Sequence, residues 1–218
     1  MTVPDKAGAF RGSVRAADRE FATMPRALLS IALLCVAAGF ACAQSPEPPP
    51  IVKTRCAACH GEKGEAAGED FPRLAAQHEA YLAKQLADFK AGRRESIMQR
   101  MVRGLSDEEL AAAAKYYASQ PVPPPAAKSE LHDVGRFIFL RGNPWAKIPA
   151  CKACHGESAH GSAQLPRLAT QNAAYLERQI REFTQRKRTN DNEVMHSIAE
   201  RLTALEARAV AEYLATLP

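Results

Sequence analysis

Apolar side chains recur along the chain at the spacing of helices rather than strands. Segment 81–89 places Leu82, Leu86 and Phe89 on one face, and segment 110–117 shows the same periodicity. Residues three and four apart share a face of an α-helix, whereas a half-buried strand needs strict alternation, which no segment shows convincingly. The pattern therefore predicts an all-α fold.

Polar residues mark two helix starts. Ser106 is followed three residues later by Glu109, and Thr203 is followed in the same way by Glu206. In such a capping box the hydroxyl and the carboxylate bind backbone N–H groups that the first helical turn leaves free. We expect a capped helix to begin at each of these places.

The first 43 residues have the pattern of an export signal. The apolar run Leu28–Phe40 follows Arg26 and precedes Ala41-Cys42-Ala43. Because this run is shorter than the ~20 residues that span a bilayer, it favours a cleaved signal peptide over a permanent anchor. Residues 1–43 are thus interpreted as an over-extended gene start plus signal peptide, and the mature chain is expected to begin at Gln44 in the periplasm.

Two details of this segment bear on its processing. Met24 is the expected initiator, because the charged segment 1–23 would make an abnormally long region before the apolar run. A lipid on Cys42 is the alternative to cleavage after Ala43, although Gly39-Phe40-Ala41 makes a poor lipoprotein motif.

The rest of the chain contains an internal repeat. Cys56–Glu62 reappears as Cys151–Glu157, and Phe71–Ala75 reappears as Leu165–Ala169. The match continues in pairs that are equally spaced in both copies: Tyr81 and Tyr175, Leu82 and Leu176, Gln85 and Gln179, Phe89 and Phe183. Such self-similarity indicates two copies of one small domain.

Proline content divides the two copies. Residues 121–128 contain four prolines, which disfavour a helix and predict an extended linker. We therefore expect one domain over residues 44–120 and a second over residues 129–218. Four more prolines lie between residues 44 and 55, so the opening helix of the first domain is expected to be very short.

Every cysteine after residue 43 lies in one of two C-x-x-C-H motifs: Cys56, Cys59 and His60, then Cys151, Cys154 and His155. This motif is the attachment signal of c-type haem, in which two thiols bind the porphyrin edge and the histidine binds iron. A zinc ribbon would need cysteine pairs about 15 to 20 residues apart, and a thioredoxin-like dithiol would need alternating strands and helices. Two covalently bound haem c groups are predicted.

The repeat also selects the second axial ligand of each iron. Met195 is the one methionine of the second copy and lies seven residues before Leu202, and Met98 stands in the same relation to Leu105. Met101 fails this alignment. A thioether opposite histidine favours ferrous iron and closes the coordination site. The alternative ligands are histidines elsewhere in the two copies: His78, His160 and His196.

Net charge gives no support to a nucleic-acid role. The formal charge of +5 falls to +3 when residues 1–43 are removed, and haem propionates would offset the remainder. The basic run Arg186-Lys187-Arg188 is read as a solvated face, with docking or propionate pairing as the alternative.

These motifs resemble the dihaem cytochrome c4 proteins and the related cytochrome c553 group, over nearly all of the mature chain. The resemblance rests on the two C-x-A-C-H-G sites, the Pro-Arg-Leu segments, the Tyr-Leu-x-x-Gln helices, the segment 188–191 before Met195 and the capped last helices. It implies two tandem class I cytochrome c domains, related by a pseudo-twofold axis with haem propionate edges facing each other.

The resemblance also implies roles for neighbouring residues. The carbonyl groups of Pro72 and Pro166 would accept the N–H of the iron-binding histidines, and four further side chains would lie at the propionates: Arg73, Tyr81, Arg167 and Tyr175. The short start of the first copy departs from the family pattern, so we expect its haem to be more exposed and more easily perturbed.

The expected function is electron transport by a periplasmic dihaem cytochrome rather than catalysis. Electrons would pass from respiratory-chain or dehydrogenase donors to a terminal oxidase, with redox proteins as partners and any membrane association only through them. One alternative is an electron-transfer subunit of a periplasmic oxidoreductase. A dihaem peroxidase or gas-binding protein is a weaker alternative, because two methionine ligands would close both irons.

Overall fold

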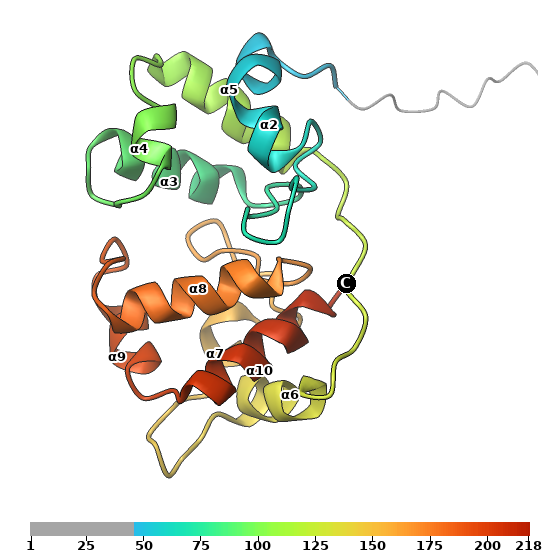
Figure 1. Ribbon diagram of the computed structural model, residues 1–218, viewed down its shortest axis with the longest axis vertical. Coiled ribbons are helices and arrows are strands. Elements are labelled where there is room, and N and C mark those ends of the chain that lie inside the picture. The colour runs from blue at the N-terminus through green and yellow to red at the C-terminus, as the bar shows by residue number, and fades with distance from the viewer. Residues whose placement is uncertain (1–45) are drawn as a thin grey trace, which may run out of the picture. The chain divides into compact units, whose positions relative to one another are not determined.

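The computed structural model describes residues 46–218, which belong to one compact unit (Figure 1). The signal-peptide assignment for residues 1–43, with its cleavage site and initiator, falls outside the described residues. Within residues 46–218, every helix is too short or too polar to cross a bilayer.

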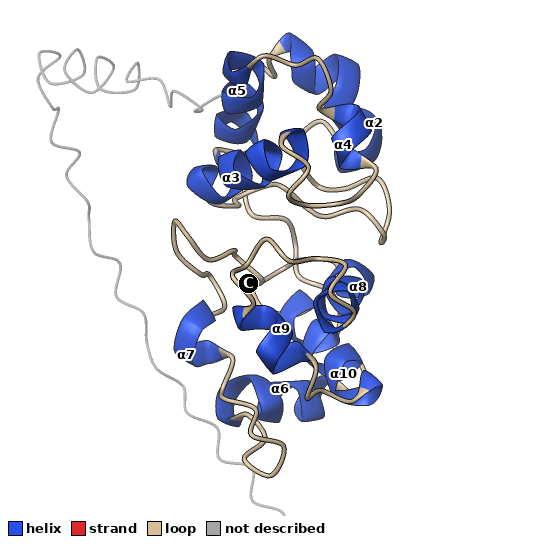
Figure 2. Cartoon of the chain, turned by 90° about the vertical axis from the view of Figure 1, so that its left-hand side faces the viewer, coloured by secondary structure: helices blue, strands red, loops and turns tan. Residues whose placement is uncertain are grey.

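The described chain is helical, which confirms the all-α prediction. The first copy contains the π-helical turn η2 (Val52–Cys56) and helices α2 (Ala57–His60), α3 (Glu79–Lys90), α4 (Met98–Met101) and α5 (Asp107–Ala118). The second contains α6 (His132–Arg141), α7 (Lys152–His155), α8 (Ala173–Thr184), α9 (Val194–Ala199) and α10 (Ala204–Ala215). Figure 2 shows helices and loops but no strand over residues 46–218, and one isolated bridge joins Asn143 to Ile148.

Both expected capping boxes are present. The backbone N–H of Glu109 donates to the Ser106 hydroxyl at 3.2 Å, and Ser106 N–H donates back to the Glu109 carboxylate at 2.8 Å. Thr203 and Glu206 make the same exchange at 3.2 and 2.9 Å. These bonds fix where α5 and α10 begin.

Each copy has its own hydrophobic core. In the first, α3 packs against α5, and Val52 from the opening turn is fully buried in the same cluster. In the second, α10 packs against both α6 and α8, with Phe139 fully buried. Residues 121–125 between the copies form no helix, as their prolines predict.

The two copies differ most at their openings. The second begins with the ten-residue helix α6, which crosses α10 so closely that a Cβ on Gly135 would lie 1.9 Å from the carbonyl oxygen of Ala209. The first copy begins instead with η2 and α2, whose residues 52–60 include the whole C-x-x-C-H motif. The first C-x-x-C-H motif therefore lies within the opening helical segment itself.

Candidate functional site

Both C-x-x-C-H motifs adopt the same local structure. Cys56 and Cys151 stand immediately before α2 and α7, while the second cysteine and the histidine lie on those four-residue helices. All four thiols are free, and each of the two leading cysteines packs against the core of its own copy. The helical turn places two sulfurs and one imidazole close together in sequence and space.

The two histidines of these motifs are buried. His60 is 6% exposed, and its Nδ1 lies 3.1 Å from the carbonyl oxygen of Pro72, to which it donates when that nitrogen is protonated. Burial lowers the pKa of His60, and the Pro72 carbonyl opposes the shift only in part. A neutral imidazole held through Nδ1 leaves Nε2 as a metal ligand.

His155 repeats this environment with one difference. It is 8% exposed, and burial again lowers its pKa while the nearby Pro166 carbonyl raises it. Within the described residues, however, no acceptor meets hydrogen-bond geometry with His155 Nδ1. The proximal hydrogen bond that the family resemblance implies is thus formed at His60 and incompletely formed at His155.

The leading thiols are unsuited to dithiol redox chemistry. Burial raises the pKa of Cys56 and of Cys151 to about 11. A redox-active dithiol needs a thiolate, which requires a lowered pKa. The environment therefore disfavours the thioredoxin-like alternative and fits cysteines that serve as attachment points.

The two methionines lie at corresponding places in the copies. Met98 is the first residue of α4 and packs, half-buried, against the same core cluster as Cys56. Met195 lies in α9, which packs against α8, and its backbone N–H donates to Asp191 at 2.6 Å. Met101 lies at the other end of α4 and is also half-buried.

The three alternative histidine ligands are each engaged elsewhere. His78 Nε2 lies 2.7 Å from the His160 carbonyl oxygen, and His160 Nε2 lies 2.9 Å from that of Pro218. His196 Nδ1 lies 2.8 Å from the Phe183 carbonyl oxygen, and its Nε2 lies 3.3 Å from Glu200. These contacts favour the methionines over the histidines as axial ligands.

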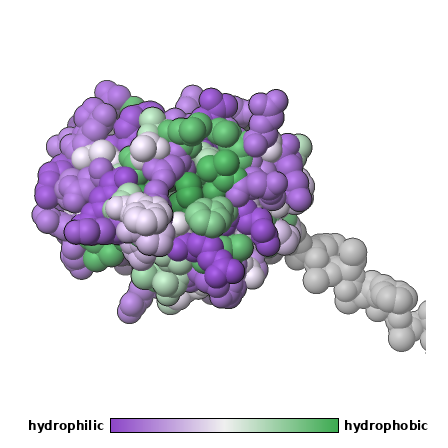
Figure 3. All heavy atoms as spheres, turned by 90° about the horizontal axis from the view of Figure 1, so that it is seen from below, coloured by the Kyte–Doolittle hydropathy of each residue, from purple (hydrophilic) through white to green (hydrophobic). Residues whose placement is uncertain are grey.

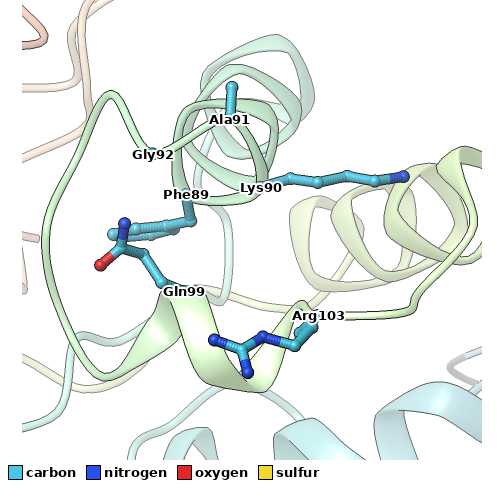
Figure 4. A pocket seen from close by; sticks show the side chains of 6 residues that line it. All are labelled: Phe89, Lys90, Ala91, Gly92, Gln99 and Arg103. Atoms are coloured by element: carbon cyan, nitrogen blue, oxygen red, sulfur yellow. The ribbon is translucent and has the colours of Figure 1, made fainter.

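Figure 4 shows a shallow pocket between the end of α3 and α4. It is lined by Phe89, Lys90, Ala91, Gly92, Gln99 and Arg103. The lining shares no residue with the C-x-x-C-H motif. It therefore borders the segment that carries Met98.

Two half-buried arginines provide a test of whether the residues fit a haem. Arg73 Nε and Arg167 Nε are buried at equivalent positions, and no acceptor from residues 46–218 reaches either atom. An arginine remains charged, so an anionic acceptor would make the strongest hydrogen bond with each of these two orphaned donors. Haem propionates are such acceptors, which the family resemblance places at these two residues, and the donor set therefore fits haem.

A second group of polar residues joins α3 to α8. The sequence did not single out its member Arg94, and it wrongly placed Arg188 on a solvated face, whereas Arg188 is 7% exposed. Arg94 donates to Gln85 at 2.7 Å, to Gln179 at 2.5 Å and to Tyr175 at 3.1 Å. Arg188 mirrors it, with bonds to Gln179 at 2.8 Å and to the Tyr81 hydroxyl at 2.9 Å. The tyrosines expected at the propionates thus also accept bonds from these arginines.

Gln77 and Gln171 were also missed. Each lies four residues after the arginine of its Pro-Arg-Leu segment and is 6% exposed, and each bonds to the backbone of the other copy. The sequence signal that could have found them is that glutamine occurs at the same position in both copies of the repeat. A buried polar side chain requires hydrogen-bond partners, so its recurrence points to a structural role.

Comparisons with known proteins match both halves. A sequence profile of the cytochrome c family matches residues 50–120 and 145–218. Cytochrome c4 of Thiocapsa roseopersicina is 40% identical over 163 residues, which cover 73% of this chain and 85% of that protein. The thiosulfate dehydrogenase electron acceptor of Thiomonas intermedia (strain K12) is 39% identical over 214 residues, covering 92% and 94%.

A solved structure agrees with the fold. The crystal structure of reduced recombinant cytochrome c4 from Pseudomonas stutzeri matches with a TM-score of 0.71 at 35% identity, covering 75% of this chain and 93% of that chain. Because the cytochrome c profile matches the chain twice, the protein carries two covalently bound haem c groups. Like its cytochrome c4 relatives, it is an electron carrier rather than an enzyme. By this duplication and by its similarity to relatives across both copies, the chain belongs to the dihaem cytochrome c4 family.

Proposed function

We propose that this electron-transfer cytochrome works as a periplasmic carrier, with Cys56, Cys59, Cys151 and Cys154 as its haem attachment sites. The observation that supports it best is the repeated geometry of α2 and α7. In each copy one helical turn carries the second cysteine of the motif, which is not fully buried, followed directly by a buried histidine. The location rests on the export pattern of Leu28–Phe40 in the sequence.

The proposed axial pairs are His60 with Met98 and His155 with Met195. When bound, haem c supplies a reversible one-electron couple at its iron. The chain's own contribution is to keep both imidazoles neutral by burial and to present a thioether from α4 or α9. A closed coordination sphere favours electron transfer over the binding of a substrate or gas.

The proposed partners are a dehydrogenase as donor and a terminal oxidase as acceptor. The relative from Thiomonas intermedia, which matches 92% of this chain, is described as a thiosulfate dehydrogenase electron acceptor, and this supports a dehydrogenase donor. The same relative favours the second candidate function, an electron-transfer subunit attached to one such dehydrogenase.

Transient docking has a suitable surface on the second copy. Figure 3 views the molecule from that end and shows apolar side chains gathered among polar ones. The exposed large apolar residues of this copy include Phe137 and Trp145, which are 60% and 97% exposed. A small exposed apolar surface suits a short-lived complex with a redox partner.

The test is the visible spectrum of the haem-loaded protein, ferric and then reduced with dithionite, with and without carbon monoxide. The wild type should show no change in either haem, whereas Met98→Ala and Met195→Ala should each open one iron and bind gas at half of the haem. Gas binding to the wild type would contradict one methionine assignment and would favour the peroxidase or gas-binding alternative.

A second measurement separates a shuttle from a subunit. The wild-type chain, purified under gentle conditions, should migrate as a free protein and exchange electrons with a dehydrogenase at a rate that depends on its concentration. Stable co-purification with a dehydrogenase would favour the subunit instead.

A further inference from the structure

Two glutamines hold the copies together through reciprocal pairs of hydrogen bonds. Gln171 accepts from the Arg73 backbone N–H at 2.7 Å and donates to the Arg73 carbonyl at 2.9 Å. Gln77 accepts from the Arg167 N–H at 2.8 Å and donates to the Arg167 carbonyl at 2.9 Å. Each carboxamide thus satisfies one backbone donor and one backbone acceptor of the opposite copy.

The position of these bonds connects them to the haem site. The N–H of Arg73 and the carbonyl of Pro72 belong to one peptide group, and that carbonyl is the partner of His60 Nδ1 at 3.1 Å. A continuous chain of hydrogen bonds therefore runs from Gln171 through the Pro72–Arg73 peptide to His60. The Pro166–Arg167 peptide stands in the same place between Gln77 and His155, where the last link is incompletely formed.

We propose that Gln77 and Gln171 are positioning residues, each of which sets the hydrogen bond on the iron-binding histidine of the opposite domain. The proposal rests on the proposed function, in which His60 and His155 bind iron. Its new content is that the partner domain, through one amide side chain, tunes the haem that it does not itself carry.

The direction of the effect follows from the polarity of the peptide group. When Gln171 accepts the Arg73 N–H, the peptide is polarised and its carbonyl becomes a stronger acceptor. A stronger acceptor on Nδ1–H makes the imidazole a more basic ligand, which favours ferric iron. Removing the Gln171 contact should therefore raise the reduction potential of the first haem. Removing Gln77 should raise that of the second by a smaller amount, because the bond from His155 Nδ1 is incompletely formed.

The experiment uses the full haem-loaded chain with Gln171→Leu and Gln77→Leu, which keep side-chain size but cannot form the amide bonds. Midpoint potentials are measured by spectroelectrochemistry and assigned to each haem by following its NMR resonances through the titration. Gln171→Leu should raise only the first potential, and Gln77→Leu only the second. This crossed pattern is one that general loosening of the structure does not produce.

A matched control removes other hydrogen bonds between the copies and leaves the chain of hydrogen bonds from Gln171 to His60 in place. Asn172 donates to the Phe71 carbonyl at 2.7 Å and to the Gly68 carbonyl at 3.2 Å. Asn172→Ala should leave both potentials at their wild-type values. Because Leu at position 171 could prevent folding, Gln171→Asn, which shortens the amide by one methylene, provides a second variant with the same expected direction.

NMR of the ferrous protein gives a readout independent of potential. In Gln171→Leu the His60 Nδ1–H resonance should move upfield and exchange faster with solvent, while that of His155 stays unchanged. Unchanged potentials, equal shifts at both haems, or a shift confined to the variant's own domain would each overturn the proposal. Such a result with intact His/Met spectra and no gas binding would leave the proposed function standing, so the two failures can be told apart.

Discussion

The substitution Gly135→Ala tests the packing that sets the second domain apart from the first. Gly135 lies in α6 at its crossing with α10, where an added Cβ would meet the Ala209 carbonyl oxygen at 1.9 Å, the Ala209 carbonyl carbon at 2.5 Å and Tyr213 Cβ at 2.7 Å. Two of these three atoms are backbone of a packed helix, so no flexible side chain can rotate away. The two helices would have to move apart.

Two opposing effects set the change in the free energy of unfolding. Alanine in a helix interior is favoured over glycine by about 1 kcal/mol. Against this, overpacking a rigid site costs about 1–3 kcal/mol and occasionally more, and the nearest contact falls about 1.5 Å short of ordinary van der Waals distance. Separating the helices also loosens Phe139, which is fully buried in the core they share. We expect a net destabilisation of about 2 kcal/mol.

Thermal and guanidinium unfolding of the haem-loaded chain, followed by circular dichroism, measures this cost. For a domain of this size about 2 kcal/mol lowers Tm by roughly 10 °C. Domains of one chain can unfold in separate transitions. Because the close contacts of Gly135 all lie in the second copy, only that copy's transition should move, and the first serves as an internal reference.

The neighbouring substitution Arg136→Ala is the matched control. Arg136 is exposed on the same helix, so its replacement should change stability by no more than about 0.5 kcal/mol. If Gly135→Ala were as stable as the wild type, the close crossing of α6 and α10 would be wrong, because helix propensity alone predicts a gain.

Three further outcomes are expected. Burial alone would raise the pKa of Asp88, but hydrogen bonds including that from Asn190 outweigh it and hold the pKa below its usual value. Its stabilising contribution is present above about pH 4 and is lost as pH falls through the lowered pKa, so Asp88→Asn should flatten the acid limb of a stability-against-pH curve. Ser106→Ala and Thr203→Ala each remove a helix cap and should cost about 1 kcal/mol in thermal unfolding. Because the Trp145 side chain is 97% exposed, Trp145→Ala should change the free energy of unfolding by no more than about 0.5 kcal/mol, as measured from Tm. The same variant should exchange electrons more slowly with a partner protein in stopped-flow measurements.

The sequence was sufficient for features that depend on near neighbours. The helix starts at Ser106 and Thr203 need only a hydroxyl and a carboxylate three residues apart, and both form as predicted. The C-x-x-C-H motifs are equally local, because one helical turn brings Cys59 and His60 into place. The all-α class followed from periodicity for the same reason.

The contacts between the copies could not be derived in this way. Gln77 meets its partner Arg167 across 90 residues, and nothing in its neighbouring sequence indicates which backbone group it will bind. The same is true of Arg94 and Tyr175, which meet across 81 residues. Such pairs depend on how two folded domains dock, and one repeated sequence permits many dockings. Repetition can show that these residues matter twice, but only the structure shows what they contact.

The two docked copies resemble a dimer whose subunits are joined by a linker. Their buried contacts are symmetric, whereas their exposed contacts are not. The Gln77 and Gln171 pairs repeat each other, as contacts across a twofold axis must. Among the exposed contacts, Lys84 donates to the Asn190 carbonyl, whereas its counterpart Arg178 bonds to Asp70.

A short tether supplies an effective concentration in the millimolar range, so polar contacts can set the docked register without a large apolar interface. Symmetric buried contacts alone would give both haems the same environment. The unequal exposed contacts, the different openings of the copies and the incomplete bond at His155 all break that equality. A duplicated domain with such differences should therefore hold its two haems at different potentials, which gives direction to electron flow through a single chain.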